Sequence, residues 1–160
     1  MSRNKAAVDE GTAARSIVND DGLRQFLGYH MKRAYSVLKS DLTKSLEPLG
    51  LRITTYSSLI LIVDNPGIRQ SELARNLDIE RPNMVVILDE LEQRGWVNRE
   101  RVESDRRSYA LFATLSGRQV CEKAITIDRA HEARLFQGLK DAQIKTLIAV
   151  LNNVERQVGE

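Results

Sequence analysis

The chain has 160 residues, of which 42% are hydrophobic and 29% charged, with a formal net charge of +2 and one cysteine. This length and composition are typical of one globular domain with a real core, and a single cysteine excludes an internal disulfide framework. The sequence has no run of about 18 apolar residues and no apolar stretch near its start, so it predicts neither a membrane span nor a secretory signal.

These properties lead us to expect a cytoplasmic protein. The polar residues 1–19 are expected to form a mobile arm ahead of a single domain at 20–160. Apolar residues then recur at helical spacing as far as Leu46. This pattern predicts one long first helix, with Asp20 or Asp21 as its N-cap.

A second helix is expected to begin at Thr54 or Thr55 and to stop at the Asn-Pro-Gly breaker of residues 65–67. Two shorter helices follow, at 68–78 and 81–95, and a tight turn joins them. Two short helices joined in this way predict a helix-turn-helix, whose second helix is the candidate reader of DNA.

The candidate reader helix has Pro82 in its first turn and Gly95 at its end, both in favourable positions. Residues 96–102 and 109–113 then alternate at period two, which is typical of β-strands. Between them lie the three charges of residues 105–107, Asp-Arg-Arg. Since a tight hairpin turn usually prefers Asn-Gly or Asp-Gly, this tip is either merely solvated or built to touch something negative.

After the hairpin, Thr114 is expected to cap a long helix and Asp141 a last amphipathic one. A helix-turn-helix followed at once by a hairpin is a winged helix. We therefore predict a mainly α fold with a small β-hairpin wing (α+β). The winged helix-turn-helix would occupy 54–114, between dimerisation helices at 20–50 and 115–160.

Arginine is concentrated in the middle of the chain. From Pro66 through Arg118 the chain contains nine of the seventeen arginines and none of the seven lysines. The planar guanidinium fork suits phosphates and groove edges. Acids are interspersed, however, so a solvated mixed surface is the alternative interpretation.

The stretch SELARNLDIERPNMVVILDELEQRGWVNRERVESDRRSYALFATLSGR resembles the MarR (multiple antibiotic resistance regulator) family of bacterial transcription factors, and the resemblance extends over residues 23–155. It implies a homodimer that binds a pseudo-palindromic operator, usually represses, and is released by a small ligand. It also implies that Arg107 enters the minor groove and that Asp105 orients it, which agrees with the negative potential of a narrow groove.

Two parts of the motif depart from the family pattern. Arg69 stands where a Ser or Thr usually caps the first helix of the motif, with Glu72 three residues on. Val85 and Val86 stand where many members place a hydroxyl and a basic residue, so apolar contacts to thymine methyls are expected there. The predicted DNA-binding residues are Arg69, Arg81, Pro82, Asn83, Val85, Val86, Asp105, Arg106 and Arg107.

A polar-aromatic band is formed by Tyr29, His30 and Arg33, with Tyr56 from the next helix. The resemblance places an effector crevice where these elements meet, and an arginine among tyrosines suits an aromatic carboxylate. The opening LGYHMKRA also resembles the branch of the family that responds to aromatic acids or their CoA thioesters. Alternatively, these are core-edge residues whose polar ends reach water.

The terminal helices carry apolar stripes too wide for one small domain to cover, so we expect them to pair across a two-fold axis. The predicted dimerisation residues are Leu23, Phe26, Leu27, Leu147, Leu151 and Val154. Two alternatives remain open: a winged-helix protein-interaction module without DNA binding, and a redox-sensing regulator that uses Cys121. Two separated histidines predict no metal site, and no catalytic or nucleotide-binding motif predicts an enzyme or a cofactor.

Overall fold

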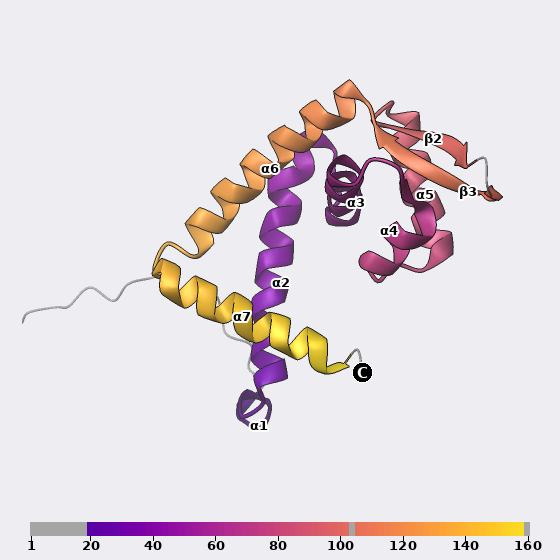
Figure 1. The fold of residues 1–160 in the computed structure, drawn as a ribbon. Helices are drawn as coiled ribbons and strands as arrows, with labels where there is room; N and C mark the ends of the chain where they lie inside the picture. The colour runs from indigo at the N-terminus through magenta and orange to yellow at the C-terminus, as the bar shows by residue number, and fades with distance from the viewer. Residues whose placement is uncertain (1–18, 103–104, 159–160) are drawn as a thin grey trace, which may run out of the picture. The chain divides into compact units, whose positions relative to one another are not determined.

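The computed structural model describes residues 19–102 and 105–158, with the backbone alone given for Val102, for residues 105–108 and for Val158. It divides into two compact units, one ending at Ser36 and the other beginning at Val37, and each unit is described by itself. Figure 1 labels helices and strands of both units. Of the arm expected at residues 1–19, the described part contains Asn19 only.

The first unit contains the short helix α1 (Asp21–Arg24) and the beginning of α2 (Leu27–Leu46). The expectation of one unbroken helix from Asp20 is therefore wrong. The chain leaves the helix at Gln25, whose side chain donates to the carbonyl oxygen of Gly22, and Phe26 N–H donates to the carbonyl oxygen of Leu23. Apolar spacing continues across this break, and for that reason periodicity did not predict it.

The second unit contains the end of α2 and all later elements. In chain order these are the 3₁₀ turn η1 (Glu47–Leu49), α3 (Ile53–Asp64), β1 (Ile68–Arg69), α4 (Gln70–Asn76), α5 (Arg81–Gln93), β2 (Val97–Val102), β3 (Asp105–Ala113), α6 (Leu115–Leu135) and α7 (Asp141–Val158). This order confirms the predicted mainly helical fold with a helix-turn-helix and a hairpin wing.

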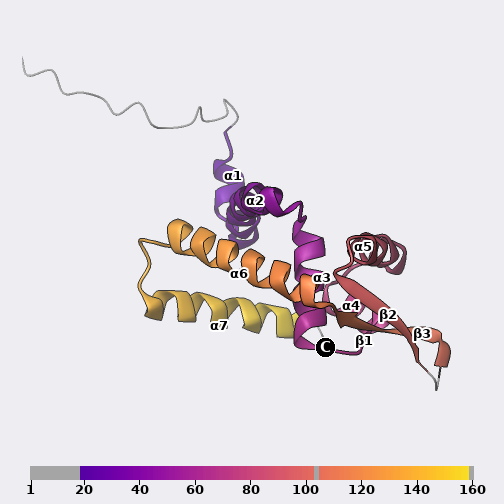
Figure 2. The ribbon, with the colours of Figure 1, turned by 90° about the horizontal axis from the view of Figure 1, so that it is seen from above.

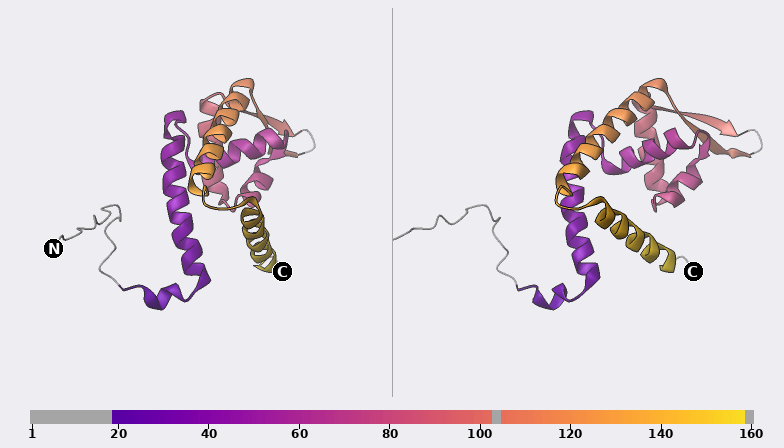
Figure 3. Two further views of the ribbon diagram at one scale, coloured as in Figure 1. Left: turned by 90° about the vertical axis from the view of Figure 1, so that its left-hand side faces the viewer. Right: turned by 60° about the vertical axis from the view of Figure 1, so that its left-hand side comes forward.

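Three antiparallel strands form the sheet, in the order β1-β3-β2. Strand β1 was not predicted, because it has only two residues, Ile68 and Arg69, which pair with Leu111 and Ala110 of β3. The charged residues 105–107 begin β3 rather than interrupting the hairpin, since Asp105 already pairs with Val102. Figures 2 and 3 show this hairpin projecting beyond α4 and α5 of the same unit.

Helix ends agree with the sequence at some positions and differ at others. The Thr114 hydroxyl caps α6 by accepting from Gly117 N–H at 3.0 Å, and Gly95 follows α5 with φ +68°, as predicted. Neither Thr54 nor Thr55 caps α3, because the helix begins one residue earlier, after the extended residue Arg52.

Asp141 does not cap α7 but is its first helical residue, after Lys140. The side chain of Gln143 accepts from the Lys140 N–H at 2.8 Å instead. The acid at the start of the helix still lies near the positive end of the helix dipole, which is a favourable place for it.

The core of the second unit lies between α3, the helix-turn-helix and the base of the wing. Its fully buried side chains include Leu59, Ile62, Leu73, Met84, Leu88, Leu91, Val97 and Leu111. Every element of the motif contributes to this core, so the reader helix and the wing are fixed on one support.

Candidate nucleic-acid interface

Helix α5 divides its residues cleanly between the core and the surface. Met84, Ile87, Leu88 and Leu91 are buried, as the helical period requires. All five residues predicted to read DNA from this helix lie on the opposite, exposed side: Arg81, Pro82, Asn83, Val85 and Val86. Val86 is 60% exposed and Val85 39%, which is unusual for valine and leaves two apolar side chains available to an external partner.

Arg69 lies at the junction of β1 and α4, and its side chain is exposed. Its backbone N–H donates to Glu72 Oε2 at 2.9 Å, so Glu72 supplies the capping contact expected of an acid at this position. The guanidinium of Arg69 forms no hydrogen bond or ion pair with the described residues and is available to an anion.

The wing residues Asp105, Arg106 and Arg107 have described backbone in β3, but their side chains lie outside the description. Their predicted roles in groove binding therefore stay predictions. What the structure supplies is their position at the start of β3, where Asp105 pairs with Val102 at the far end of the hairpin.

Arg99 of β2 joins the wing to the reader helix. Its side chain is mostly buried and forms ion pairs with Asp89 and with Glu92, the latter at 3.2 Å from Nε. Sequence reasoning missed this contact, because it joins a strand residue to acids one turn apart on another element. The pair fixes β2 against α5 and partly neutralises two acids on a face expected to meet DNA.

A second set of charges joins the start of α3 to α5. Arg52 pairs with Glu90, and Arg94 lies 3.2 Å from the same carboxylate. The Arg94 guanidinium also lies over the Trp96 ring, 4.9 Å from its centroid. These contacts hold the reader helix at its C-terminal half and were not predicted.

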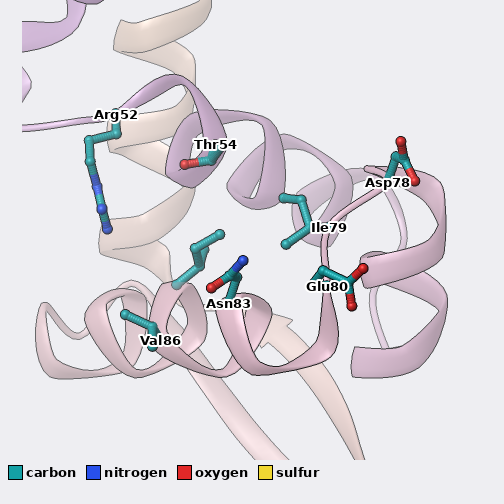
Figure 4. Close-up of a pocket in the computed structure, with 8 residues that line it drawn as sticks. Arg52, Thr54, Asp78, Ile79, Glu80, Asn83 and Val86 are labelled. Atoms are coloured by element: carbon teal, nitrogen blue, oxygen red, sulfur yellow. The ribbon is translucent and has the colours of Figure 1, made fainter.

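An open hollow of about 400 Å³ lies between the first turn of α3 and the first turns of α5 (Figure 4). Its lining combines apolar with polar and charged side chains, from Arg52, Thr54, Asp78, Ile79, Glu80, Asn83, Val86 and Ile87. Because two predicted readers, Asn83 and Val86, form one wall, the hollow belongs to the candidate DNA-binding face.

Three of the four predicted effector residues lie in the first unit. The Tyr29 hydroxyl donates to Asp20 Oδ2 at 2.6 Å, and the Arg33 guanidinium lies over the Tyr29 ring, 5.7 Å from its centroid. The His30 ring meets that of Tyr29 edge-on, at 6.2 Å between centroids. Hydrogen bonds from Arg24 and Tyr29 lower the pKa of Asp20 to about 2.

The fourth, Tyr56, belongs to the second unit and is buried there. Its hydroxyl donates to Asp128 Oδ2 at 3.0 Å. Burial, and then the hydrogen bond to Asp128, raise the pKa of Tyr56 well above its usual range. The structure therefore brings Tyr29, His30 and Arg33 together, whereas a common site with Tyr56 stays a prediction.

Asp128 also belongs to a polar cluster around the buried His131 that the sequence did not indicate. The buried His131 ring has Asp41 Oδ2 3.3 Å from Nε2 and Asp128 Oδ1 3.5 Å from Nδ1, and Arg134 pairs with Asp41. The cluster joins α2, α3 and α6 within the second unit, through side chains far apart in the sequence.

Cys121 is buried in α6. Burial raises its thiol pKa from an ordinary value near 9 to about 11. Because the thiolate is the reactive form, this environment favours the structural interpretation over redox sensing.

The predicted dimerisation residues remain accessible in each unit. Leu23, Phe26 and Leu27 are exposed in the first unit, and Leu147 and Val154 in the second, with Leu151 half-buried. These apolar side chains match what a partner surface would cover.

Within the described ranges, no helix is by itself long and apolar enough to cross a membrane; the segments Leu27–Leu49 and Ile53–Asp64 meet such a criterion only when joined across a 71° bend. Across residues 19–102 and 105–158, no three His, Cys, Asp or Glu side chains are grouped so as to hold a metal ion.

Comparison with known proteins agrees with this geometry. The family model described as MarR family matches residues 51–109. The HTH-type transcriptional repressor Rv2887 of Mycobacterium tuberculosis is 32% identical over 117 residues, which cover 73% of this chain and 84% of the relative.

Among solved structures, the transcriptional repressor CouR bound to a 23-mer DNA duplex has a TM-score of 0.82 at 36% identity, covering 88% of this chain and 99% of that one. CouR bound to p-coumaroyl-CoA has a TM-score of 0.78 at 33% identity, covering 87% and 98%. Rv2887 in complex with salicylic acid has a TM-score of 0.65 at 30% identity, covering 81% and 96%.

Proposed function

Because the chain belongs to the MarR family of transcriptional regulators, we propose that it is a repressor that binds a pseudo-palindromic operator as a homodimer and is released by a small organic anion. It would act in the cytoplasm and not as an enzyme. The observation that carries the proposal is that one core of the second unit holds both α5 and the wing. The exposed side of α5 is therefore held in a fixed position next to the wing.

The division of labour on this face follows from its chemistry. Arg69, Arg81 and the wing arginines would contact phosphates and the minor groove, where negative potential is highest. Val85 and Val86 would meet thymine methyls in the major groove, beside the Asn83 amide. Because few polar side chains are available to read base edges directly, DNA shape is expected to contribute much of the specificity.

Binding can be tested by fluorescence anisotropy with the DNA that flanks the protein's own gene and with a scrambled duplex. We expect tighter binding to the former, with a steep dependence on salt. If neither duplex is bound, the DNA-binding proposal is wrong and a protein-interaction module becomes the better interpretation.

The wing arginines offer a matched pair of variants for the same assay. Arg107→Ala should cost about 1–3 kcal/mol of operator binding per half-site, as the loss of a groove contact typically does. Arg106→Ala should instead weaken operator and scrambled DNA alike and flatten the salt slope by about one unit. Arg107→Ala binding the operator as tightly as wild type would show that the wing is only a solvated hairpin.

The effector is proposed to be an aromatic carboxylate or its CoA thioester. Two similar proteins support this class, since CouR is bound to p-coumaroyl-CoA and Rv2887 to salicylic acid. Arg33→Ala should leave operator affinity nearly intact while raising the effector concentration needed for release. Loss of DNA binding and ligand response together would instead identify Arg33 as structural.

A further inference from the structure

In the first unit, one carboxylate lies where the predicted effector-binding side chains converge. Asp20 Oδ2 accepts from the Tyr29 hydroxyl at 2.6 Å and lies 3.7 Å from Arg33 Nη1, while Oδ1 accepts from Arg24 Nε at 2.7 Å. The His30 ring nitrogen Nε2 lies 2.7 Å from the carbonyl oxygen of Arg24. All three predicted effector residues of this unit thus contact the segment Asp20–Arg24.

Asp20 leaves the hydrogen-bond donors of the Arg33 guanidinium largely unused. The distance of 3.7 Å from Arg33 Nη1 to Asp20 Oδ2 is too long for a hydrogen bond, and Nη1 donates instead to the Tyr29 hydroxyl in a long contact of 3.4 Å. The Arg33 side chain is 57% exposed. Its planar guanidinium can therefore still donate two parallel hydrogen bonds to a carboxylate, the strongest geometry for this pair.

We propose that Asp20 is a built-in competitor: its carboxylate occupies the anion position of the effector site, and an aromatic carboxylate binds by displacing it from Tyr29 and Arg33. The inference rests on the proposed effector response and deepens it by naming the group of this chain that competes with the ligand. Displacement would also release α1, which Asp20 and Arg24 hold against α2.

Three physical arguments support an exchange of carboxylates. An exposed ion pair is weak, so an incoming ligand can replace it. The ligand gains the bidentate contact to Arg33 that Asp20 does not make, and the rings of Tyr29 and His30 offer a planar molecule an aromatic surface. Because the pKa of Asp20 is lowered to about 2, the competitor is ionised at every physiological pH.

Calorimetric titration can test the exchange with salicylate and, as a neutral analogue, salicylamide. Asp20→Asn keeps the side chain's shape but removes its charge, so salicylate should bind about three- to tenfold more tightly, since the site is no longer partly occupied. Salicylamide, which cannot form an ion pair with Arg33, should bind weakly to both proteins. Asp21→Asn is the matched control, because it removes the same charge one residue away, where no side-chain contact to Tyr29 or Arg33 exists.

Equal changes in Asp20→Asn and Asp21→Asn would overturn the proposal, because they would show a general effect of charge. Unchanged salicylate affinity in Asp20→Asn would overturn it as well. A gain for p-coumaroyl-CoA but not for salicylate would assign the position to a phosphate and contradict displacement by a carboxylate.

Release from operator DNA separates this inference from the proposed function. Without ligand, Asp20→Asn should bind DNA like wild type. Because salicylate binds it more tightly, the salicylate concentration that releases it should be lower by the same factor of about three to ten. If ligands release wild type and Asp20→Asn alike, the competitor is disproved and the effector response stands. If no ligand binds or releases either protein, both proposals fail.

Discussion

Gly117 lies in the first turn of α6 and faces the backbone of Trp96. A β-carbon added at Gly117 would lie 2.0 Å from the Trp96 carbonyl oxygen. That oxygen cannot easily move away, because it accepts from Thr114 N–H at 3.0 Å, and the Thr114 side chain caps the same helix. The absence of a side chain at Gly117 is thus what lets α6 begin directly against the base of the wing.

Gly117→Ala should therefore lower the free energy of unfolding by about 2 kcal/mol or more, at the upper end of what overpacking usually costs. Urea denaturation measures the loss. Gly138→Ala is the control, since an added β-carbon there has no neighbour within 4 Å and should change stability by less than about 0.5 kcal/mol. Equal stability of the two variants would contradict the close approach at Trp96.

The reactivity of the Cys121 thiol provides a second test at a single residue. Since burial raises its thiol pKa from near 9 to about 11, the folded protein holds almost no thiolate at pH 8. Iodoacetamide should label the thiol slowly in the native protein and rapidly in urea, and peroxide should leave operator binding unchanged. Fast native labelling would restore the redox interpretation.

The pH dependence at Cys121 has a definite sign. Because the folded protein disfavours the thiolate, the protonated Cys121 thiol contributes fully to the free energy of unfolding below pH 9. This contribution is lost as the pH rises toward about 11. Cys121→Ala should lack this component of the alkaline loss of stability. An identical pH profile of unfolding in wild type and variant would show that the thiol does not experience this burial.

At the scale of elements, the Arg99 contacts decide how the wing meets the reader helix. Arg99→Met should destabilise the protein by roughly 1 kcal/mol, because the ion pairs with Asp89 and Glu92 are lost while the two acids remain half-exposed to water. In a double-mutant cycle with Asp89→Asn, we expect a coupling energy of about 0.5–1 kcal/mol. Additive effects would mean that the pair contributes nothing to joining β2 and α5.

The boundaries of elements were predictable where a local signal determines them. Helix α5 ends before Gly95, which has a positive φ, and α6 begins after the Thr114 cap, both as expected. Each boundary depends on residues adjacent in sequence. The break between α1 and α2 has no such signal, and β1 has only two residues that acquire their strand geometry from pairing with β3.

The predictability of the candidate site follows the same division. The exposed side of α5 follows from the helical period alone, so the reader residues could be chosen from the sequence. The contacts of Arg99 with α5, and those of His131 with Asp41 of α2, join residues that only the tertiary fold brings together. The Asp20 contact with Tyr29 was missed because α1 was expected to continue into α2.

At the scale of the whole molecule, helix α7 carries the clearest sign of assembly. From residue 141 to residue 157 none of its side chains is buried, although the helix has a strong apolar stripe. Leu147 is 46% exposed and Val154 40%. A monomer would leave this stripe in water, whereas a two-fold partner would cover it with an identical surface.

Assembly as a dimer would also explain how one reader helix per chain can select a long operator. Two readers related by a two-fold axis contact two half-sites, so their binding energies combine on a palindrome. A monomer has only one reader helix and wing. Weakening the subunit interface should therefore lower operator affinity even though none of the predicted DNA-binding residues belongs to α7.

The double variant Leu147→Lys, Val154→Lys should be monomeric at micromolar concentration, because it places like charges opposite each other across the two-fold axis in an apolar interface. Asn152→Lys adds a charge to an exposed polar position of the same helix and should remain dimeric. Sedimentation or light scattering measures the mass, and anisotropy compares a full operator with a half-site. A wild type that is monomeric and still binds the full operator tightly would refute both the dimer and the palindromic mode of recognition.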